Sequence, residues 1–235
     1  MSKRLYRFFD DVCWAEQMML GSMRFMTLAF YRDYEEQQVR GDDNEGTSVF
    51  RPDCGLDINN QTQRRQFVEP DSAFESEVKA GEIFVSCLSR SNTPRIREEF
   101  KAKAYVEIVN VPEFCWRVQK AISGATFGGR PGHERIGRGV EYYDAGRPPE
   151  ARWACPDLIA CSKFDRYRWQ DEFRLLFSMT DALKFQNVQR RLVKGASGRP
   201  PDPSQHHQQT IDIGGLADIA VLNVLGEPRR ASSAL

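Results

Sequence analysis

The apolar residues of this chain occur in short runs, and that spacing limits what the chain can fold into. The clearest runs lie at residues 5–8, 81–88, 104–109, 172–177 and 217–225. Apolar runs of this length, bounded by turn-forming residues, are typical of buried β-strands. Helical patterns lie between some of them, but strands and helices do not alternate regularly along the chain. The sequence therefore predicts an α+β fold rather than a parallel α/β sheet.

The chain has 235 residues, with 33 basic and 33 acidic side chains and a formal net charge of zero. This length fits one large domain, and the charge balance argues against a disordered polyelectrolyte or a uniformly basic nucleic-acid coat protein. We predict a single α+β domain spanning residues 1–235. Polar and turn-forming residues are concentrated at 40–64, 123–139 and 194–209, and we expect long loops there.

Capping residues mark the starts of four predicted helices. Asp10–Asp11, Thr27, Thr93-Pro94 and Asn110 each precede a helical pattern. Side chains of Asp, Thr and Asn bind the free N–H groups of a first helical turn, and proline is favoured at its first position. These signals predict helices that connect the strands.

The six cysteines are scattered along the chain, and no pair has C-x-x-C spacing. A disulfide framework or a compact zinc site is typically marked by closer or more regular spacing. The N-terminal stretch carries no apolar segment of the signal-peptide type, and no apolar run reaches the roughly 18 residues of a membrane span. We therefore expect a cytoplasmic protein with reduced thiols, no bound metal and no membrane association.

The segment at residues 169–177 contains the strongest candidate for chemistry. If it forms a strand, its side chains alternate between the two faces of a sheet. The apolar members then share the core face: Phe173, Leu175 and Phe177. The polar members share the other face: Gln170, Glu172 and Arg174. A carboxylate at Glu172 can stabilise a cationic centre, or it can form a surface ion pair with Arg174 that contributes little. In either case the substitution Glu172→Gln is expected to leave the fold nearly intact.

Arg7 is the second candidate, because it lies in an apolar and aromatic segment between Tyr6 and Phe8. A guanidinium in such surroundings needs a partner. That partner is either a nearby acid or an anionic ligand, and the candidate acids are Asp10, Asp11 and Glu172. Residues 117–152 carry seven bases and four acids, and such a region can help to hold a phosphate or diphosphate. Ser86 lies near the end of another apolar segment, where a hydroxyl can orient a ligand or cap the next helix.

Several short motifs resemble, as an ordered set, a widespread uncharacterised bacterial and phage family, a domain of unknown function. The chain opens with the LYRF segment of this family and continues with its acidic turn and later strands. The resemblance covers residues 5–177. The matched positions are Asp42, Asp43, Glu45 and Gly46 in the turn, then Lys163 and Glu172-Phe173-Arg174.

The same ordered set resembles the pattern of ADP-ribosyltransferases. That pattern has an Arg on a first strand, a Ser on a second, and a Q/E-x-E motif on a later strand, matched here by Arg7, Ser86 and Gln170-x-Glu172. The resemblance implies a split β-sheet with flanking helices, NAD as the substrate bound by Arg7, Tyr6 and Ser86, and a macromolecular acceptor. It implies that Glu172 stabilises an oxocarbenium-like centre and that Gln170 faces the acceptor. A toxin or phage-defence effector would fit this activity.

Two other classes of function remain open at this point. One is a binding or interaction module without catalysis. The other is a metal-dependent nuclease, since Asp71, Glu77 and Lys79 supply the residue types that hold Mg²⁺ and assist an attacking water. The sequence does not distinguish a protein acceptor from a nucleic acid, and a homodimer is one of the assemblies it allows.

Overall fold

The central sheet forms from the segments richest in apolar and β-branched residues, and the computed structural model describes residues 4–34, 44–129, 132–195 and 200–226. This sheet has eight strands, six of which follow the order β14-β2-β7-β1-β8-β15, while β12 pairs with β7 and β9 pairs with β12. The strands are β1 (Leu5–Phe9), β2 (Ser22–Thr27), β7 (Ile83–Ser89), β8 (Ala104–Ile108), β9 (Gly137–Gly139), β12 (Glu172–Ser178), β14 (Gln208–Asp212) and β15 (Ala220–Val224). All of their pairings are antiparallel. The predicted α+β class is confirmed at this level.

The sheet divides along strand β7. One edge of β7 pairs with β12 along its whole length. The other edge is shared: β1 pairs with it at Ser89, and β2 pairs with it at Val85 and Phe84. The backbone of Cys87 lies between these two pairings, so β1 and β2 diverge from β7 at that point. This division leaves room for a side chain to reach between the two strands.

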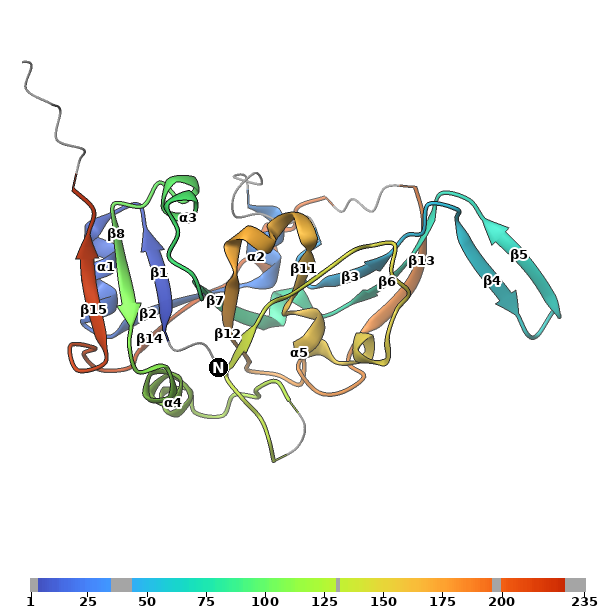
Figure 1. Ribbon diagram of the computed structural model, residues 1–235. Helices are drawn as coiled ribbons and strands as arrows, with labels where there is room; N and C mark the ends of the chain where they lie inside the picture. Colours follow the sequence, from blue (N-terminus) through green and yellow to red (C-terminus); the bar gives the residue numbers. More distant parts are fainter. Residues whose placement is uncertain (1–3, 35–43, 130–131, 196–199, 227–235) are drawn as a thin grey trace, which may run out of the picture.

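Different helices cover the two faces of the central sheet. Helices α1 (Val12–Met19) and α4 (Val111–Ala121) pack on the larger core, which includes Phe173, Leu175 and Phe177 of β12. Helices α2 (Leu28–Asp33) and α5 (Pro156–Ile159) pack on a second core on the other face. The short helix α3 (Pro94–Glu99) lies at one end of β1 and β8 (Figure 1). Among the described residues, no helix has the length and apolarity to cross a membrane.

The helix caps follow the sequence signals in three of four cases. Side-chain oxygens of Asp11, Thr93 and Asn110 accept hydrogen bonds from first-turn N–H groups at 2.9 to 3.3 Å. Thr27 precedes α2 but does not cap it through its side chain; its hydroxyl oxygen accepts from the His207 N–H at 3.3 Å and its proton goes to the Gln205 carbonyl at 2.7 Å. The hydroxyl therefore connects this corner of the sheet to a distant segment.

Smaller sheets extend from the central sheet and end in a hairpin arm (Figure 1). A three-stranded sheet contains β3 (Thr47–Phe50), β6 (Ser72–Glu77) and β13 (Gln189–Lys194), and the arm is the hairpin β4 (Leu56–Asn60) and β5 (Arg65–Glu69). Strands β10 (Glu141–Tyr143) and β11 (Ser162–Phe164) form a parallel pair. Short 3-10 helices lie at Ala80–Glu82, Ala151–Ala154, Asp165–Gln170 and Pro203–Gln205.

The predicted loop at 40–64 was wrong in its described part, because β3 and β4 lie there; residues 40–43 lie outside the described residues. Strand β4 and its partner β5 are mostly exposed, so they lack the buried apolar period that identifies a strand in a sequence. In their described parts, the other two predicted loops are largely irregular, although 123–139 ends in β9 and 194–209 ends in β14.

The core of this fold is testable at Phe177. Its ring is fully buried and lies 5.2 Å from the ring centroids of both Phe25 and Phe84. Phe177→Ala should lower the free energy of unfolding by about 3–5 kcal/mol, through lost burial and the cavity that remains. The matched control is Phe185→Ala, because Phe185 is 67% exposed and surface substitutions usually change stability by less than about 0.5 kcal/mol. Urea unfolding of both variants measures the difference, and equal losses would contradict this packing.

Candidate functional site

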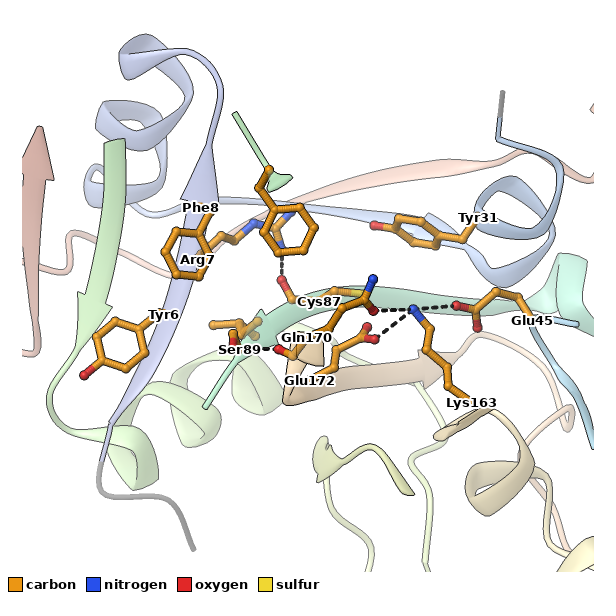
Figure 2. Close-up of a pocket in the computed structure, with 12 residues that line it drawn as sticks. Tyr6, Arg7, Phe8, Tyr31, Glu45, Cys87, Ser89, Lys163, Gln170 and Glu172 are labelled. Carbon is orange, nitrogen blue, oxygen red and sulfur yellow. Dashed lines mark hydrogen bonds and ion pairs between the residues drawn. The ribbon is translucent and has the colours of Figure 1, made fainter. Parts of the chain in front are cut away.

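A pocket opens beside the point where β1 and β2 diverge from β7. The volume of this pocket is about 120 Å³. Aromatic rings and charged groups line it together, and Figure 2 shows how they face one another. The lining residues are Tyr6, Arg7, Phe8, Tyr31, Glu45, Cys87, Leu88, Ser89, Phe100, Lys163, Gln170 and Glu172.

Arg7 reaches into the division of the sheet. Its Nη1 donates to the backbone carbonyl of Cys87 at 3.0 Å and to the hydroxyl of Ser86. Ser86 is itself fully buried, and its hydroxyl donates to the Arg24 carbonyl at 3.0 Å. The structure thus brings together the two residues that the sequence pattern placed on separate strands. Ser86 orients Arg7 and does not line the pocket.

The charge of Arg7 has no acidic partner in the described part of the chain. None of the predicted acids, Asp10, Asp11 and Glu172, pairs with it; its contacts are the Ser86 hydroxyl, the Cys87 carbonyl and the ring of Phe9 at 5.8 Å. These partners satisfy hydrogen bonds without neutralising the guanidinium. Arg7 therefore presents a positive charge at the wall of the pocket.

The opposite wall is a buried cluster of four charges. Arg174 donates to Glu45 at 2.6 and 2.8 Å and to Glu172 at 3.0 Å. Lys163 Nζ lies 3.1 Å from a Glu45 oxygen and 2.9 Å from a Glu172 oxygen. All four side chains are at most 6% exposed. Two carboxylates and two cations balance, so the cluster is neutral as a whole.

Of the two alternatives for Glu172, the surface ion pair with Arg174 was wrong, because the pair exists but is buried. Every residue of β12 is buried, because both faces of this strand are covered. Glu172→Gln should therefore destabilise the fold and not leave it nearly intact, since removing one member of a buried charge cluster leaves its partner uncompensated.

Burial and pairing act in opposite directions on the ionisable groups of this cluster. Burial alone would raise the pKa of Glu172, but Arg174 and Lys163 outweigh it and hold that pKa well below its ordinary value. Burial alone would lower the pKa of Lys163, but Glu172 and Glu45 hold it well above its ordinary value. Both groups therefore stay charged. Burial, reinforced by Glu172, raises the pKa of the Cys87 thiol far above neutrality, so this cysteine is not a thiolate nucleophile.

Gln170 reaches the cluster from outside the strand. It ends a 3-10 helix, and Asp171 then adopts a left-handed conformation with φ of 42° before β12 begins at Glu172. The strand predicted at 172–177 is confirmed as β12, whereas the longer alternative that begins at residue 169 was wrong. The turn still directs Gln170 inward. Lys163 Nζ donates to the side-chain Oε1 of Gln170 at 3.0 Å, and Ser89 Oγ donates to the backbone carbonyl of Gln170 at 2.7 Å.

Other sequence-predicted residues lie elsewhere. No described residue of the basic region 117–152 lines the pocket; Arg117 pairs with Glu113 and Asp218, and Arg152 pairs with Glu141 and Glu150. Asp71 and Glu77 flank opposite ends of β6 and so do not converge. Lys79 faces Glu82 at 3.7 Å. Within the described ranges, no group of three or more His, Cys, Asp or Glu side chains is placed to hold a metal.

Sequence reasoning missed several members of the pocket. Glu45 and Lys163 were identified only as motif positions without a role, and Asp42 and Asp43 of the same motif lie outside the described residues. Tyr31, Cys87 and Phe100 carried no local signal, because only the fold brings them to the pocket. Comparison with protein-family models, curated proteins and solved structures found no match to this chain.

The coupling within the cluster can be measured with a double-mutant cycle. Glu45→Gln and Arg174→Met should each lower the free energy of unfolding by about 3–5 kcal/mol, since each leaves a buried charge uncompensated. The double variant leaves Lys163 paired with Glu172, so it should cost less than the sum by about 1–3 kcal/mol. Urea unfolding supplies the four values.

The exposed pair of Lys184 and Asp181, 2.8 Å apart and 64% and 67% exposed, is the matched control for that cycle. Its coupling should be below about 1 kcal/mol, because surface ion pairs are solvated. A coupling in the buried cycle that is no larger than in this control would show that the cluster is not coupled as described.

Acid should destabilise the protein through Glu172. The unfolded carboxyl titrates near its ordinary pKa of 4.5, whereas the folded-state pKa lies well below this value. The unfolded chain thus binds a proton that the folded chain does not, so the stabilisation is present above about pH 5 and declines as the pH falls below that. Between pH 5 and pH 3, roughly the window this linkage defines, the wild type should lose more stability than Glu172→Gln. An equal decline in the two proteins would exclude Glu172 as the titrating group.

Proposed function

We propose that the pocket binds NAD and that the protein transfers ADP-ribose to a macromolecular acceptor. The observation that carries this proposal is the convergence of one sequence pattern on one pocket. Tyr6 and Arg7 come from β1, Gln170 ends the 3-10 helix before β12, Glu172 begins β12, and all four line the same space. Ser86, from β7, holds Arg7 in place. These segments are far apart in the sequence, and the fold brings together the residues that the ADP-ribosyltransferase pattern requires.

The chemistry of the pocket fits a dinucleotide. NAD carries a diphosphate between two planar bases. The unneutralised guanidinium of Arg7 can bind phosphate oxygens through charge-assisted hydrogen bonds. The rings of Tyr6, Phe8, Tyr31 and Phe100 offer flat apolar surface for a base. One cation and several rings in one small space are a better match to a nucleotide than to a purely anionic or purely apolar ligand.

The proposed reaction needs a fixed negative charge near the nicotinamide ribose. The glycosidic bond between C1 and the nicotinamide nitrogen breaks, and its electron pair leaves with nicotinamide. An acceptor oxygen or nitrogen then bonds to C1 and loses its proton. Glu172 supplies an ionised carboxylate that Arg174 and Lys163 hold in one position, and preorganised charge of this kind stabilises a developing cation.

One observation favours a second candidate, a module that binds a nucleotide without cleaving it. Both oxygens of Glu172 are already engaged, by Arg174 Nε at 3.0 Å and by Lys163 Nζ at 2.9 Å. Two adjacent cations reduce the field that this carboxylate exerts on a ribose carbon. Binding and catalysis therefore need separate tests.

Binding is tested by thermal unfolding with NAD. NAD at about 100 times its Kd should stabilise the folded state by about 2.7 kcal/mol and raise the Tm accordingly. Arg7→Gln should weaken binding about 10- to 100-fold, since a hydrogen bond to a charged group contributes about 1.5–3 kcal/mol. Arg147→Gln, at an exposed arginine that does not line the pocket, should keep the full shift. An unchanged Tm for the folded wild type in millimolar NAD would refute the proposed ligand.

Catalysis is tested by the release of nicotinamide. Glu172→Gln keeps the size of the side chain and removes its charge, so the rate should fall about 10²- to 10³-fold if the carboxylate stabilises the transition state. Because this variant is also destabilised, rates are compared at a temperature at which both proteins are folded by circular dichroism, and NAD binding is measured in parallel. Equal rates in the two proteins, or no release by a wild type that binds NAD, would favour the binding module.

A further inference from the structure

A continuous row of aromatic rings, which we call the aromatic face, extends from the pocket across β1 and β8. Its members are Tyr6, Phe8, Phe100, Tyr105 and Trp169, and all five are partly exposed. Tyr105 lies 6.2 Å from Tyr6 and 5.9 Å from Phe8 between ring centroids. Phe100 lies 6.0 Å from Phe8 and 5.8 Å from Trp169. No ring in the row is isolated from the others.

The strand register explains why the rings share one side. Phe8 lies directly opposite Tyr105 in the antiparallel pair of β1 and β8. Among the residues that alternate with them, Leu5 and Val106 belong to the larger core, whereas Arg7 reaches the pocket. Helices α1 and α4 cover that core side, and Figure 1 shows α1 behind β15, β8 and β1, whose other side is turned toward the viewer. The aromatic face therefore lies on the side of these strands away from both helices.

Positive charges border the aromatic face. Arg97 lies over the ring of Tyr105 at 5.4 Å, and Arg95 lies over the ring of Trp169 at 5.1 Å. Lys101 and Lys103 follow in the same segment, which also holds the acids Glu98 and Glu99. Within the described ranges none of the four bases forms an ion pair, whereas the acid on β8, Glu107, is paired with Arg4. These bases are therefore available to an anionic partner.

We propose that the aromatic face binds single-stranded nucleic acid, with bases stacked on its rings and phosphates on Arg95, Arg97, Lys101 and Lys103. Unpaired bases stack on aromatic side chains, and basic groups alongside follow the phosphate backbone. Aromatic residues and Arg are enriched at protein interfaces as well, but the buried centres of those interfaces are depleted of charge and of Lys in particular, so rings bordered by four basic side chains without acidic partners in the described ranges match a polyanion better. Binding of the nucleic acid depends on the aromatic face alone and does not require NAD.

The position of the aromatic face also indicates which acceptor the proposed ADP-ribosyl transfer would use. Tyr6, Phe8 and Phe100 line the pocket as well as belonging to the row. Tyr105 and Trp169 belong to the row without lining the pocket, so a strand stacked on these two rings leaves the pocket rings to NAD and ends beside the pocket that holds Gln170 and Glu172. If the proposed ADP-ribosyl transfer holds, on which this step rests, the bound strand is the acceptor.

Fluorescence anisotropy with fluorescein-labelled 12-nucleotide single strands of RNA and DNA tests the binding, with a duplex of the same sequence as the comparison. The wild type should bind the single strands more tightly than the duplex. Tyr105→Ala should weaken single-strand binding about 5- to 150-fold, the range that loss of one stacking ring gives. Tyr105→Phe should bind within about twofold of the wild type, because the ring that stacks remains. Tyr105→Leu keeps apolar bulk in the sheet without a flat ring, and its weakened binding would show that loss of folding is not the cause.

The matched control is Trp116→Ala. Trp116 is 54% exposed and has Lys120 over its ring at 4.8 Å, but it belongs to α4 on the other side of the sheet. This variant should bind like the wild type. Failure of the wild type to bind either single strand, or equal binding by folded Tyr105→Ala, would overturn the proposal. Since Tyr105 does not line the pocket, NAD-induced stabilisation should survive in Tyr105→Ala, so a failure of this proposal is distinguishable from a failure of NAD binding.

Discussion

The packing of strands β11 and β12 and of the turn that carries Glu45 depends on one buried guanidinium, that of Arg174. Arg174 is 1% exposed and lies in the middle of the sheet. Burying such a charge costs several kcal/mol unless partners compensate for it. Glu45 and Glu172 supply the compensation, and Lys163 in turn balances the second carboxylate. The turn that carries Glu45, strand β11 and strand β12 are therefore held together by electrostatics as well as by apolar packing.

The neutrality of this cluster determines the character of the pocket beside it. A wall with unbalanced acids would repel a phosphorylated ligand. Here Arg174 and Lys163 balance the two acids. The unneutralised charge on the facing wall is the cation of Arg7. The Arg7 side chain reaches the pocket through the division of the sheet at β7. The divergence of β1 and β2 therefore determines where the positive charge of the pocket lies.

Period-two patterning predicted the core face of β12 correctly, because Phe173, Leu175 and Phe177 alternate as a strand requires. The same pattern could not show that the other face is buried as well. Glu45 and Arg174 are 129 positions apart, and no local signal joins them. The apolar run at 172–177 predicted the strand correctly, but Gln170 does not belong to it, because Asp171 adopts a left-handed conformation without the glycine that usually marks one. Arg7 and Ser86 were selected as separate positions of a family pattern, and the contact between them was not predicted.

The central claim is that the pocket beside the divergence of β1 and β2 is a dinucleotide site in which Arg7 binds phosphate. A crystal structure of the wild-type protein with NAD tests this claim most directly. The account predicts diphosphate oxygens within hydrogen-bond distance of the Arg7 guanidinium, and the nicotinamide ribose against Gln170 and Glu172. NAD bound elsewhere on the protein, or bound in the pocket with its diphosphate away from Arg7, would contradict the account.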